Sequence, residues 1–311
     1  MNALETFGLE KTYTVGFWRS KPKIALRPLT LQVEEGEIFG YLGPNGAGKT
    51  TTLRLLMGLA EPTGGTFNIL GGAISDPAVR ARIGFLPEQP YFYDHLTALE
   101  LLNYYAALSG VDAKERTRRI EATLTRVGLA RDAWRTQLRK FSKGMLQRVG
   151  LAQAVLHDPK LVILDEPMSG LDPMGRREVR DLIEELQQEG KTILFSTHIL
   201  SDAESLCDRV AVLKKGELKG IGVVADLAAS VKGNVEILWQ GAQAEAAISA
   251  LGVQCHNAGE TMRAIVAEAQ VDRAIDILRG QGAKLVSVTP VRATLEDYFL
   301  AQLAKPAEER R

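Results

Sequence analysis

The sequence has few cysteines, no net charge and no long apolar run. Its 311 residues include two cysteines, Cys207 and Cys255, which match no metal-ligand spacing, so we expect ordinary thiols in a reducing compartment. Lys plus Arg equals Asp plus Glu at 38 each, which predicts no overall attraction to nucleic acid or to anionic membranes. No segment approaches 18 apolar residues in a row, so we expect no membrane-spanning helix.

The sequence also lacks targeting and repetitive segments. Its first residues, MNALETFGLEKTY, have no basic start and no continuous apolar stretch, so we expect no signal peptide. There is no low-complexity tract and no internal repeat. The apolar share of 45% and the charged share of 24% are typical of a folded protein with one large domain or two smaller ones.

Short apolar strings alternate with helical patterns through the first two thirds of the chain. Strings without polar interruption are typical of strands that are covered on both faces, so the pattern predicts an α/β core with a mostly parallel sheet. The expected strands are 38–42, 83–86, 161–164, 192–195 and 210–213. The expected helices are 50–59, 99–109, 113–127, 143–156 and 175–188.

Three departures from this alternation predict further parts. Residues 88–158 have almost only helical patterns, which indicates an inserted helical subdomain. The stretch LTLQVEEGEIF predicts two paired strands around a turn at Glu35–Gly36, and hence an antiparallel flank. After residue 222 a small α/β domain is expected over 223–311, with strands NVEILW, TMRAIVAE and AKLVSV, a last helix TLEDYFLAQLA and a loose tail.

The stretch GPNGAGKT fits the phosphate-loop pattern at Gly43, Gly48, Lys49 and Thr50. It follows an expected strand and opens an expected helix, whose free amides attract phosphate; a purely structural glycine turn is the alternative. Lys49 is predicted to reach the β- and γ-phosphates, and the Thr50 hydroxyl to bind Mg²⁺. The remaining expected phosphate-binding residues are Pro44, Asn45, Gly46, Ala47 and Thr51.

The stretch LVILDEP places Asp165 and Glu166 at the end of a buried strand. One carboxylate is predicted to hold Mg²⁺, and the other to polarise an attacking water as general base. A solvated acidic strand end is the alternative for such a pair taken alone. Together with the phosphate loop, the pair indicates a P-loop nucleotidase.

The stretch FSKGMLQRVG (141–150) predicts a helix with Ser142 as its cap, but Met145 stands where a capping box would have Glu or Gln. With the two motifs above, FSKGMLQR resembles the signature stretch, usually LSGGQ, of ATP-binding-cassette (ABC) ATPases. The resemblance covers roughly residues 4–220. It implies ATP and Mg²⁺ as ligands, and a dimer in which Ser142, Lys143 and Gly144 of one copy close over the ATP of the other.

The resemblance implies roles for further residues. Gln89, in LPEQP, matches the glutamine that contacts the metal and nucleotide, and Asp172, in SGLD, matches the family's D-loop aspartate. His198, in STH, matches the histidine that contacts the γ-phosphate. Taken singly, these residues are also explained as a loop amide, a helix cap and a satisfied strand-end histidine.

The resemblance implies that Glu166 is the general base that orients the water and that Asp165 is the metal ligand. It also implies that Lys49 and His198 are catalytic, because they stabilise the γ-phosphate.

Tyr13 resembles the family's adenine-stacking aromatic. Phe17 or Trp18 could take that role, because the stretch VGFWRSKPKIAL is longer than the family's usual segment. In the signature stretch, Lys143 replaces a glycine and is expected to add positive potential near the nucleotide or to point into solvent. Met145 replaces the glutamine and is a poor partner for a ribose hydroxyl.

Three functional classes fit an ABC ATPase: a transporter subunit, a soluble ATPase acting on DNA or the ribosome, and an inert scaffold. The segment between the motifs has no sustained heptads and no cysteine cluster, unlike DNA-repair cassettes, and the chain has one cassette, unlike translation factors. Intact Lys49, Asp165 and Glu166 argue against a scaffold. We therefore expect a transporter subunit without direct nucleic-acid binding, peripheral on the cytoplasmic face of the inner membrane, with a separate transmembrane permease.

Two stretches suggest how this subunit is used. ATLEDYFLAQL (293–303) resembles the ending of ATPase subunits of multidrug and sodium-efflux exporters. The aromatic stretch EQPYFYDHLTALELLNYY is the expected dock for a helix of the permease, although helical packing also explains some of its aromatics.

Overall fold

The computed structural model describes residues 1–311 except 17–20, 230–233, 292–293, 297 and 299–311. The chain divides into two compact units, Met1–Val223 and Val224–Arg311. Among the described residues, no helix is both long and apolar enough to cross a membrane.

A six-stranded sheet with the order β5-β6-β7-β3-β8-β9 forms the centre of the first unit. Neighbouring strands are parallel except for β9, which is antiparallel to β8. Every residue of β3, β6 and β7 is buried, which is why uninterrupted apolar strings revealed them in the sequence. The strands are β3 (Ile38–Leu42), β5 (Ile83–Leu86), β6 (Leu161–Asp165), β7 (Thr192–Thr197), β8 (Arg209–Lys214) and β9 (Glu217–Val223).

A separate antiparallel sheet forms the expected flank, with the order β2-β1-β4. Its strands are β1 (Asn2–Val15), β2 (Lys21–Glu34) and β4 (Gly64–Ile69). The predicted pairing across the turn at Glu35–Gly36 is wrong, because β2 pairs with β1 whereas β3 pairs with β7 and β8. The Gly36 amide donates to Thr192 Oγ1 at 2.9 Å, so the turn leads the chain into the other sheet.

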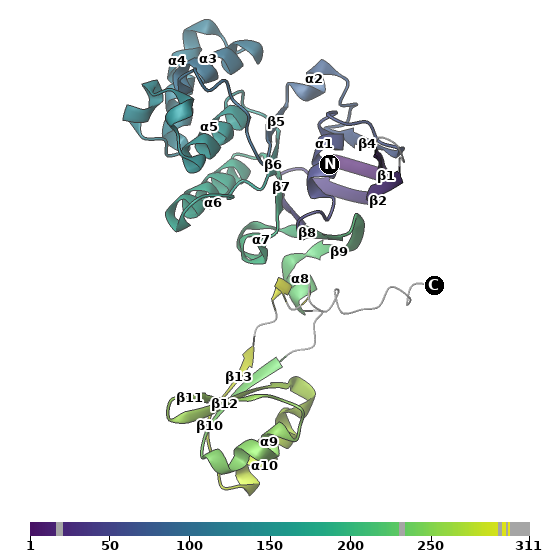
Figure 1. Cartoon of the computed structure of the whole chain (residues 1–311), viewed down its shortest axis with the longest axis vertical. Coiled ribbons are helices and arrows are strands. Elements are labelled where there is room, and N and C mark those ends of the chain that lie inside the picture. The colour runs from purple at the N-terminus through teal and green to yellow at the C-terminus, as the bar shows by residue number, and fades with distance from the viewer. Residues whose placement is uncertain (17–20, 230–233, 292–293, 297, 299–311) are drawn as a thin grey trace. The chain divides into compact units, whose positions relative to one another are not determined.

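The five expected helices of the first unit begin and end near their predicted positions. They are α1 (Lys49–Leu56), α3 (Ala98–Leu108), α4 (Ala113–Arg126), α5 (Lys143–Val155) and α6 (Pro173–Gln188), with short 3₁₀ turns at Arg131–Arg135 and Leu138–Lys140. Two short helices, α2 (Pro77–Arg80) and α7 (Leu200–Leu206), were not predicted. In Figure 1, α3, α4 and α5 group together beyond β5 and β6, and their buried side chains share one core with α6. The predicted α/β fold with a helical insertion and an antiparallel flank is confirmed.

The second unit is a four-stranded antiparallel sheet with the order β11-β12-β10-β13. Buried Trp239 lies in the core between this sheet and its helices. The elements are α8 (Val224–Ala229), β10 (Asn234–Gln240), α9 (Glu245–Ser249), β11 (Cys255–Ala258), β12 (Thr261–Ala267), α10 (Val271–Gly280) and β13 (Lys284–Val291), with 3₁₀ turns at Ala242–Ala244 and Glu268–Gln270. Strand β11 was not expected, because its mostly exposed residues have no apolar pattern. Most of the expected last helix and the tail lie outside the described residues.

Candidate functional site

The phosphate-loop stretch lies between β3 and α1 in a conformation that requires glycine. Gly48, the residue before α1, has φ 108°, and a Cβ there would lie 2.7 Å from the Ala25 carbonyl oxygen. A Cβ on Gly43 would lie 2.5 Å from the Leu213 carbonyl oxygen. A Cβ on Gly46 would have no neighbouring atom within 4 Å. The loop is therefore pressed against β2 and the end of β8 on one side and open on the other.

A cavity of about 640 Å³ lies on the open side of this loop, a size that accepts a nucleotide. It is lined by the expected phosphate-loop residues except Gly43, and by Tyr13, which is half-buried on β1. The Lys11 ammonium lies 5.0 Å from the centre of the Tyr13 ring. The cavity is lined by Tyr13, Val15, Lys23, Ile24, Ala25, Pro44, Asn45, Gly46, Ala47, Gly48, Lys49, Thr50, Thr51, Glu88 and Glu166. Phe17 and Trp18, the alternatives to Tyr13, lie outside the described residues.

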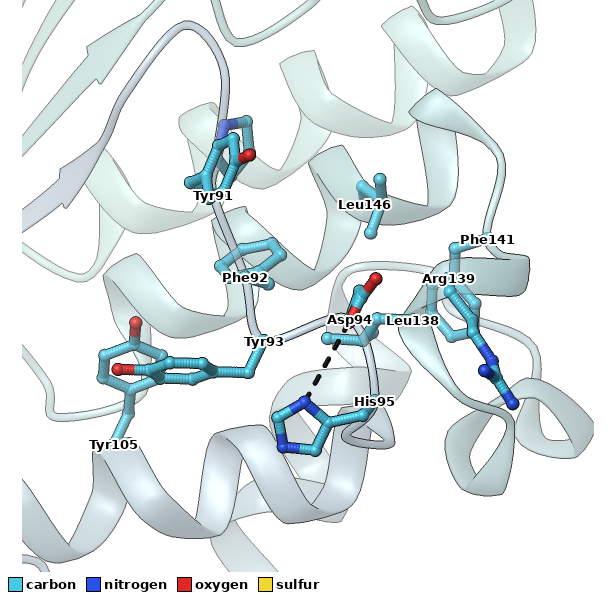
Figure 2. Close-up of a pocket in the computed structure, with 11 residues that line it drawn as sticks. Tyr91, Phe92, Tyr93, Asp94, His95, Tyr105, Leu138, Arg139, Phe141 and Leu146 are labelled. Atoms are coloured by element: carbon cyan, nitrogen blue, oxygen red, sulfur yellow. Dashed lines mark ion pairs between the residues drawn. The ribbon is translucent and has the colours of Figure 1, made fainter.

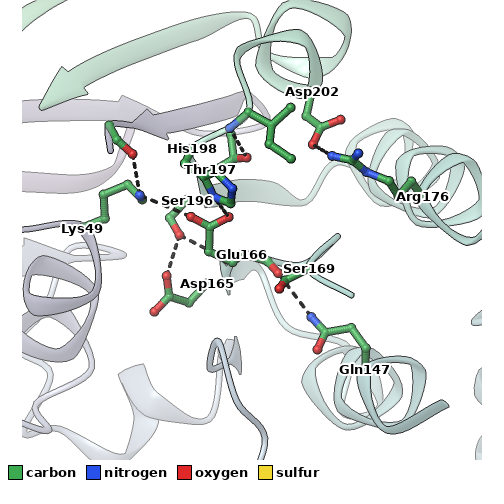
Figure 3. Close-up of polar contacts among 12 residues, drawn as sticks. Lys49, Gln147, Asp165, Glu166, Ser169, Arg176, Ser196, Thr197, His198 and Asp202 are labelled. Carbon is green, nitrogen blue, oxygen red and sulfur yellow. Dashed lines mark hydrogen bonds and ion pairs between the residues drawn. The ribbon is translucent and has the colours of Figure 1, made fainter. Parts of the chain in front are cut away.

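Lys49 and Glu166 meet at the edge of this cavity. Nζ of Lys49 lies 3.2 Å from Oε1 of Glu166 and donates to the Gly43 carbonyl at 2.6 Å. Both side chains are almost fully buried, at 6% and 10% exposure. Nδ1 of His198, at the end of β7, lies 2.9 Å from Oε2 of Glu166 (Figure 3). The structure thus brings together the three residues predicted to be catalytic.

Glu166 has φ 52°, which is rare for a residue with a side chain. Neighbouring residues of a regular strand point to opposite faces, so Asp165 and Glu166 would diverge if β6 continued. The turn at Glu166 lets its carboxylate reach Lys49 and His198 while Asp165 stays buried. Strain of this kind costs about 1–3 kcal/mol and often marks functional sites.

Asp165 and Thr50 are two predicted metal ligands, and Asp165 is fully buried at the end of β6. Burial raises the pKa of Asp165, while hydrogen bonds from Ser196 and Thr50 act in the opposite direction. Among the described residues, no three His, Cys, Asp or Glu side chains converge on a metal site. One carboxylate and one hydroxyl fit Mg²⁺, which binds through few protein ligands when phosphates supply the others. Gln89, the third predicted ligand, is exposed after β5.

The start of α5 is capped from within the chain. Oγ of Ser142 accepts a hydrogen bond from the Met145 amide at 3.2 Å, so one first-turn donor has a local partner despite the missing capping box. Among the residues that the structure describes, the amides of Lys143 and Gly144 have no acceptor. These two donors are the ones that α5 offers to a ligand from outside.

Lys143 is exposed, and its contribution of positive potential near the nucleotide stays a prediction. Its ammonium donates to Ser169 Oγ at 3.2 Å, and its stem covers Gly170, where a Cβ would lie 2.6 Å from the Lys143 Cδ. Lys143 therefore fastens α5 to the loop before α6. Asp172, at the end of that loop, caps α6 by accepting from the Gly175 amide at 2.8 Å, so α6 begins earlier than expected.

Two further buried side chains hold the site and were missed in the sequence. Ser196 Oγ contacts Asp165 and Glu166, and Nε2 of Gln147, on α5, donates to the Pro167 carbonyl at 2.9 Å (Figure 3). Ser196 had a usable signal, since it stands two positions before His198 and side chains two apart share a face of a strand. Gln147 had none, because a glutamine in a helix is ordinarily a surface residue.

Comparison with known proteins places the chain in a family. The ABC transporter family model matches residues 26–169. An uncharacterized ABC transporter ATP-binding protein of Synechocystis is 46% identical over 97% of this chain and 85% of that protein. The bacitracin transport ATP-binding protein BcrA of Bacillus licheniformis is 45% identical over 61% of this chain and 62% of its own length.

Solved structures agree. A dimeric ATP-binding cassette in a post-hydrolysis state, bound to ADP and Pi, superposes with a TM-score of 0.66 and 27% identity, over 71% of this chain and 98% of that one. The residues that the family model matches include the phosphate loop, Asp165 and Glu166. The chain belongs to the family of ABC transporter ATP-binding proteins.

Proposed function

We propose that this chain is the ATP-hydrolysing subunit of a membrane transporter whose separate transmembrane subunit moves the substrate. The observation that carries the proposal is the position of Glu166, which contacts both Lys49 and His198 at the edge of a nucleotide-sized cavity. A carboxylate beside a phosphate-binding lysine lies close to the γ-phosphate of a bound nucleotide, where a general base for water is needed.

In the proposed reaction, Glu166 orients a water molecule for in-line attack on the γ-phosphorus and accepts a proton from it. The bond between the γ-phosphorus and the bridging oxygen breaks, which leaves ADP and inorganic phosphate. Lys49 and His198 stabilise the charge on the γ-phosphate oxygens, because preformed donors in a water-poor site cost no reorganisation during the reaction.

Binding of the whole nucleotide draws on the rest of the cavity. The amides of the phosphate loop and the start of α1 bind the phosphates, and Tyr13 stacks on the adenine. Thr50 and Asp165, with Gln89 from the loop after β5, would hold Mg²⁺, which would supply positive charge against the triphosphate. Glu88, which precedes Gln89 in the chain, lines the cavity.

A second copy of the chain completes the site in this proposal. The amides of Lys143 and Gly144 and the Ser142 hydroxyl close over the γ-phosphate bound to the opposing copy, and Asp172 lies in the same contact region. The support is the pair of amides at the start of α5 that have no acceptor among the described residues, and the dimeric state of the similar cassette that holds ADP and Pi. ATP therefore drives closure of the dimer, and its hydrolysis reopens it.

The transmembrane subunit docks, in this proposal, on an aromatic groove beside α3 and α5 (Figure 2). The groove encloses about 680 Å³, and Tyr91 is 97% exposed at its rim. Phe92 and Leu146 offer apolar surface, while Asp94 and Arg139 offer charges. A short amphipathic helix fits this mixture, with apolar side chains inside the groove and polar ones at its edge.

The direction of transport is proposed to be export, from the resemblance of residues 293–303 to exporter subunits. The chain then lies on the cytoplasmic face of the inner membrane, held there by the transmembrane subunit. The bacitracin transport protein among its relatives supports a role in transport.

Co-purification from membranes tests the proposal. The tagged chain should hydrolyse ATP in the presence of Mg²⁺ and should bring down a protein with several transmembrane helices. Tyr91→Ser should lose that protein and keep ATP hydrolysis, whereas Leu108→Ser, an exposed apolar change outside the groove, should keep both. Recovery of ribosomes or DNA without a membrane protein would favour a soluble ATPase instead.

A further inference from the structure

Ser196 lies beside Asp165 and Glu166, the two consecutive carboxylate residues of the site. It is fully buried at 0% exposure in β7, and the parallel register places it directly beside Asp165 of β6. The proposed reaction assigns no step to Ser196. Its hydroxyl nevertheless contacts both residues that the reaction needs on this strand end (Figure 3).

The hydrogen bonds of this hydroxyl have only one consistent direction. Oγ of Ser196 lies 2.5 Å from Oδ1 of Asp165, and the Glu166 amide nitrogen lies 3.1 Å from Oγ. An amide N–H can only donate, so Oγ accepts from the Glu166 amide. The hydroxyl proton is then donated to the Asp165 carboxylate. The length of the bond to Asp165 is that of a charge-assisted hydrogen bond.

We propose that Ser196 is a positioning residue that sets the Asp165 carboxylate and the backbone of Glu166 as one unit. Because Oγ accepts from the Glu166 amide, it helps to hold the positive φ that aims the Glu166 carboxylate at Lys49. Because it donates to Asp165, it selects one orientation of that carboxylate. The proposal rests on the proposed function, in which Asp165 faces the metal and Glu166 the water.

An apolar side chain in place of Ser196 would pack in this strand, but the Glu166 amide and the Asp165 carboxylate would both lose their hydrogen bond to the hydroxyl. The Glu166 amide would keep only the Ser196 carbonyl, at 3.2 Å, and Asp165 would lose its shortest contact. A carboxylate that can rotate and a turn that can relax both lower the fraction of molecules in the reactive geometry. Removal of the hydroxyl is therefore expected to act on the metal-dependent step more than on nucleotide binding.

The test compares Ser196→Ala, Ser196→Thr and the original chain. Ser196→Ala should lower kcat about 10- to 100-fold and change the KM for ATP by less than about threefold. Binding of ADP, which is not turned over, is measured with and without Mn²⁺. The gain in ADP affinity that Mn²⁺ produces should be about 5- to 10-fold smaller in Ser196→Ala than in the original chain, and metal-free ADP binding should be unchanged. Ser196→Thr keeps a hydroxyl and should restore both properties to within about threefold.

Thr192→Val is the matched control, because Thr192 is a buried hydroxyl at the other end of β7 that accepts from the Gly36 amide. It should leave kcat and metal-dependent affinity unchanged even where it lowers stability. If Ser196→Ala does not fold, Ser196→Cys, with a weaker donor, should give an intermediate loss.

Several results would overturn the proposal. One is a folded Ser196→Ala chain whose kcat and Mn²⁺ effect lie within twofold of the original. A second is a folded Ser196→Thr chain as impaired as Ser196→Ala. A third is a folded Ser196→Cys chain with no loss. If the original chain shows no Mg²⁺-dependent hydrolysis, the proposed function fails instead. Hydrolysis that depends on Glu166 but not on Ser196 refutes the present inference alone.

Discussion

Lys49 and Glu166 form a buried ion pair, with Nζ 3.2 Å from Oε1. The ammonium that should bind the γ-phosphate is therefore engaged by the carboxylate that should orient the water. A bound phosphate would compete with Glu166 for Lys49, and the freed carboxylate would then turn toward the water. Breaking a buried ion pair costs free energy unless the freed charge gains a new partner. Glu166 should therefore separate from Lys49 only when a nucleotide phosphate takes its place.

Glu166→Gln tests this competition. The amide is neutral and attracts Lys49 less, so ATP affinity should rise about three- to tenfold while hydrolysis falls at least about 100-fold, from loss of the general base. Calorimetry and phosphate release measure the two effects. Glu88→Gln, a carboxylate lining the same cavity, should leave hydrolysis within about threefold. Undiminished hydrolysis in Glu166→Gln would refute the general-base assignment.

Tyr13→Ala should weaken ATP binding about 10-fold, because stacking of one base on an aromatic ring contributes about 1–3 kcal/mol. Tyr13→Phe keeps the ring and should bind ATP like the original chain. Affinity is measured with a fluorescent ATP analogue. If Trp18→Ala weakens ATP binding and Tyr13→Ala does not, the adenine stacks on Trp18 and not on Tyr13.

Lys143→Gly should destabilise the first unit, since it removes the stem that covers Gly170 and places glycine in the first turn of α5. We expect a loss of about 1 kcal/mol in the free energy of unfolding. Lys143→Met keeps the stem and loses only an exposed hydrogen bond, so its loss should stay below about 0.5 kcal/mol. Urea titrations give both values. Equal effects of the two changes would contradict the packing role.

His157 makes stability depend on pH. Burial lowers the pKa of His157, although its Nε2 lies 3.0 Å from the Ile83 carbonyl oxygen, a contact that acts in the opposite direction. Below the ordinary histidine pKa the unfolded chain binds a proton that the folded chain does not, so stability falls as the pH is lowered. His157→Gln should reduce that fall by about 0.5–1 kcal/mol between pH 7 and pH 5.5. His256→Gln, at an exposed position, should leave the slope unchanged.

The sequence predicted the parts that depend on local pattern. Buried apolar strings revealed β3 and β6, and the phosphate loop was marked by glycines whose positions the backbone requires. The predicted pairing of β2 with β3 was wrong, because a turn at Gly36 specifies a change of direction and not the sheet that the chain enters next. Side-chain partners such as Lys143 with Ser169 depend on tertiary packing, and the residue types alone did not predict them.

The central claim is that ATP joins two copies of this chain through the start of α5, and the mass of the particle tests it most directly. With Glu166→Gln and ATP, light scattering should show the mass rising from that of one chain, 33.9 kDa, to that of two. ADP should produce no such rise. Adding Ser142→Ala and a bulky Gly144→Val should prevent the rise while ATP still binds to the monomer. A particle that stays monomeric with bound ATP, or that dimerises equally with ADP, would contradict the account.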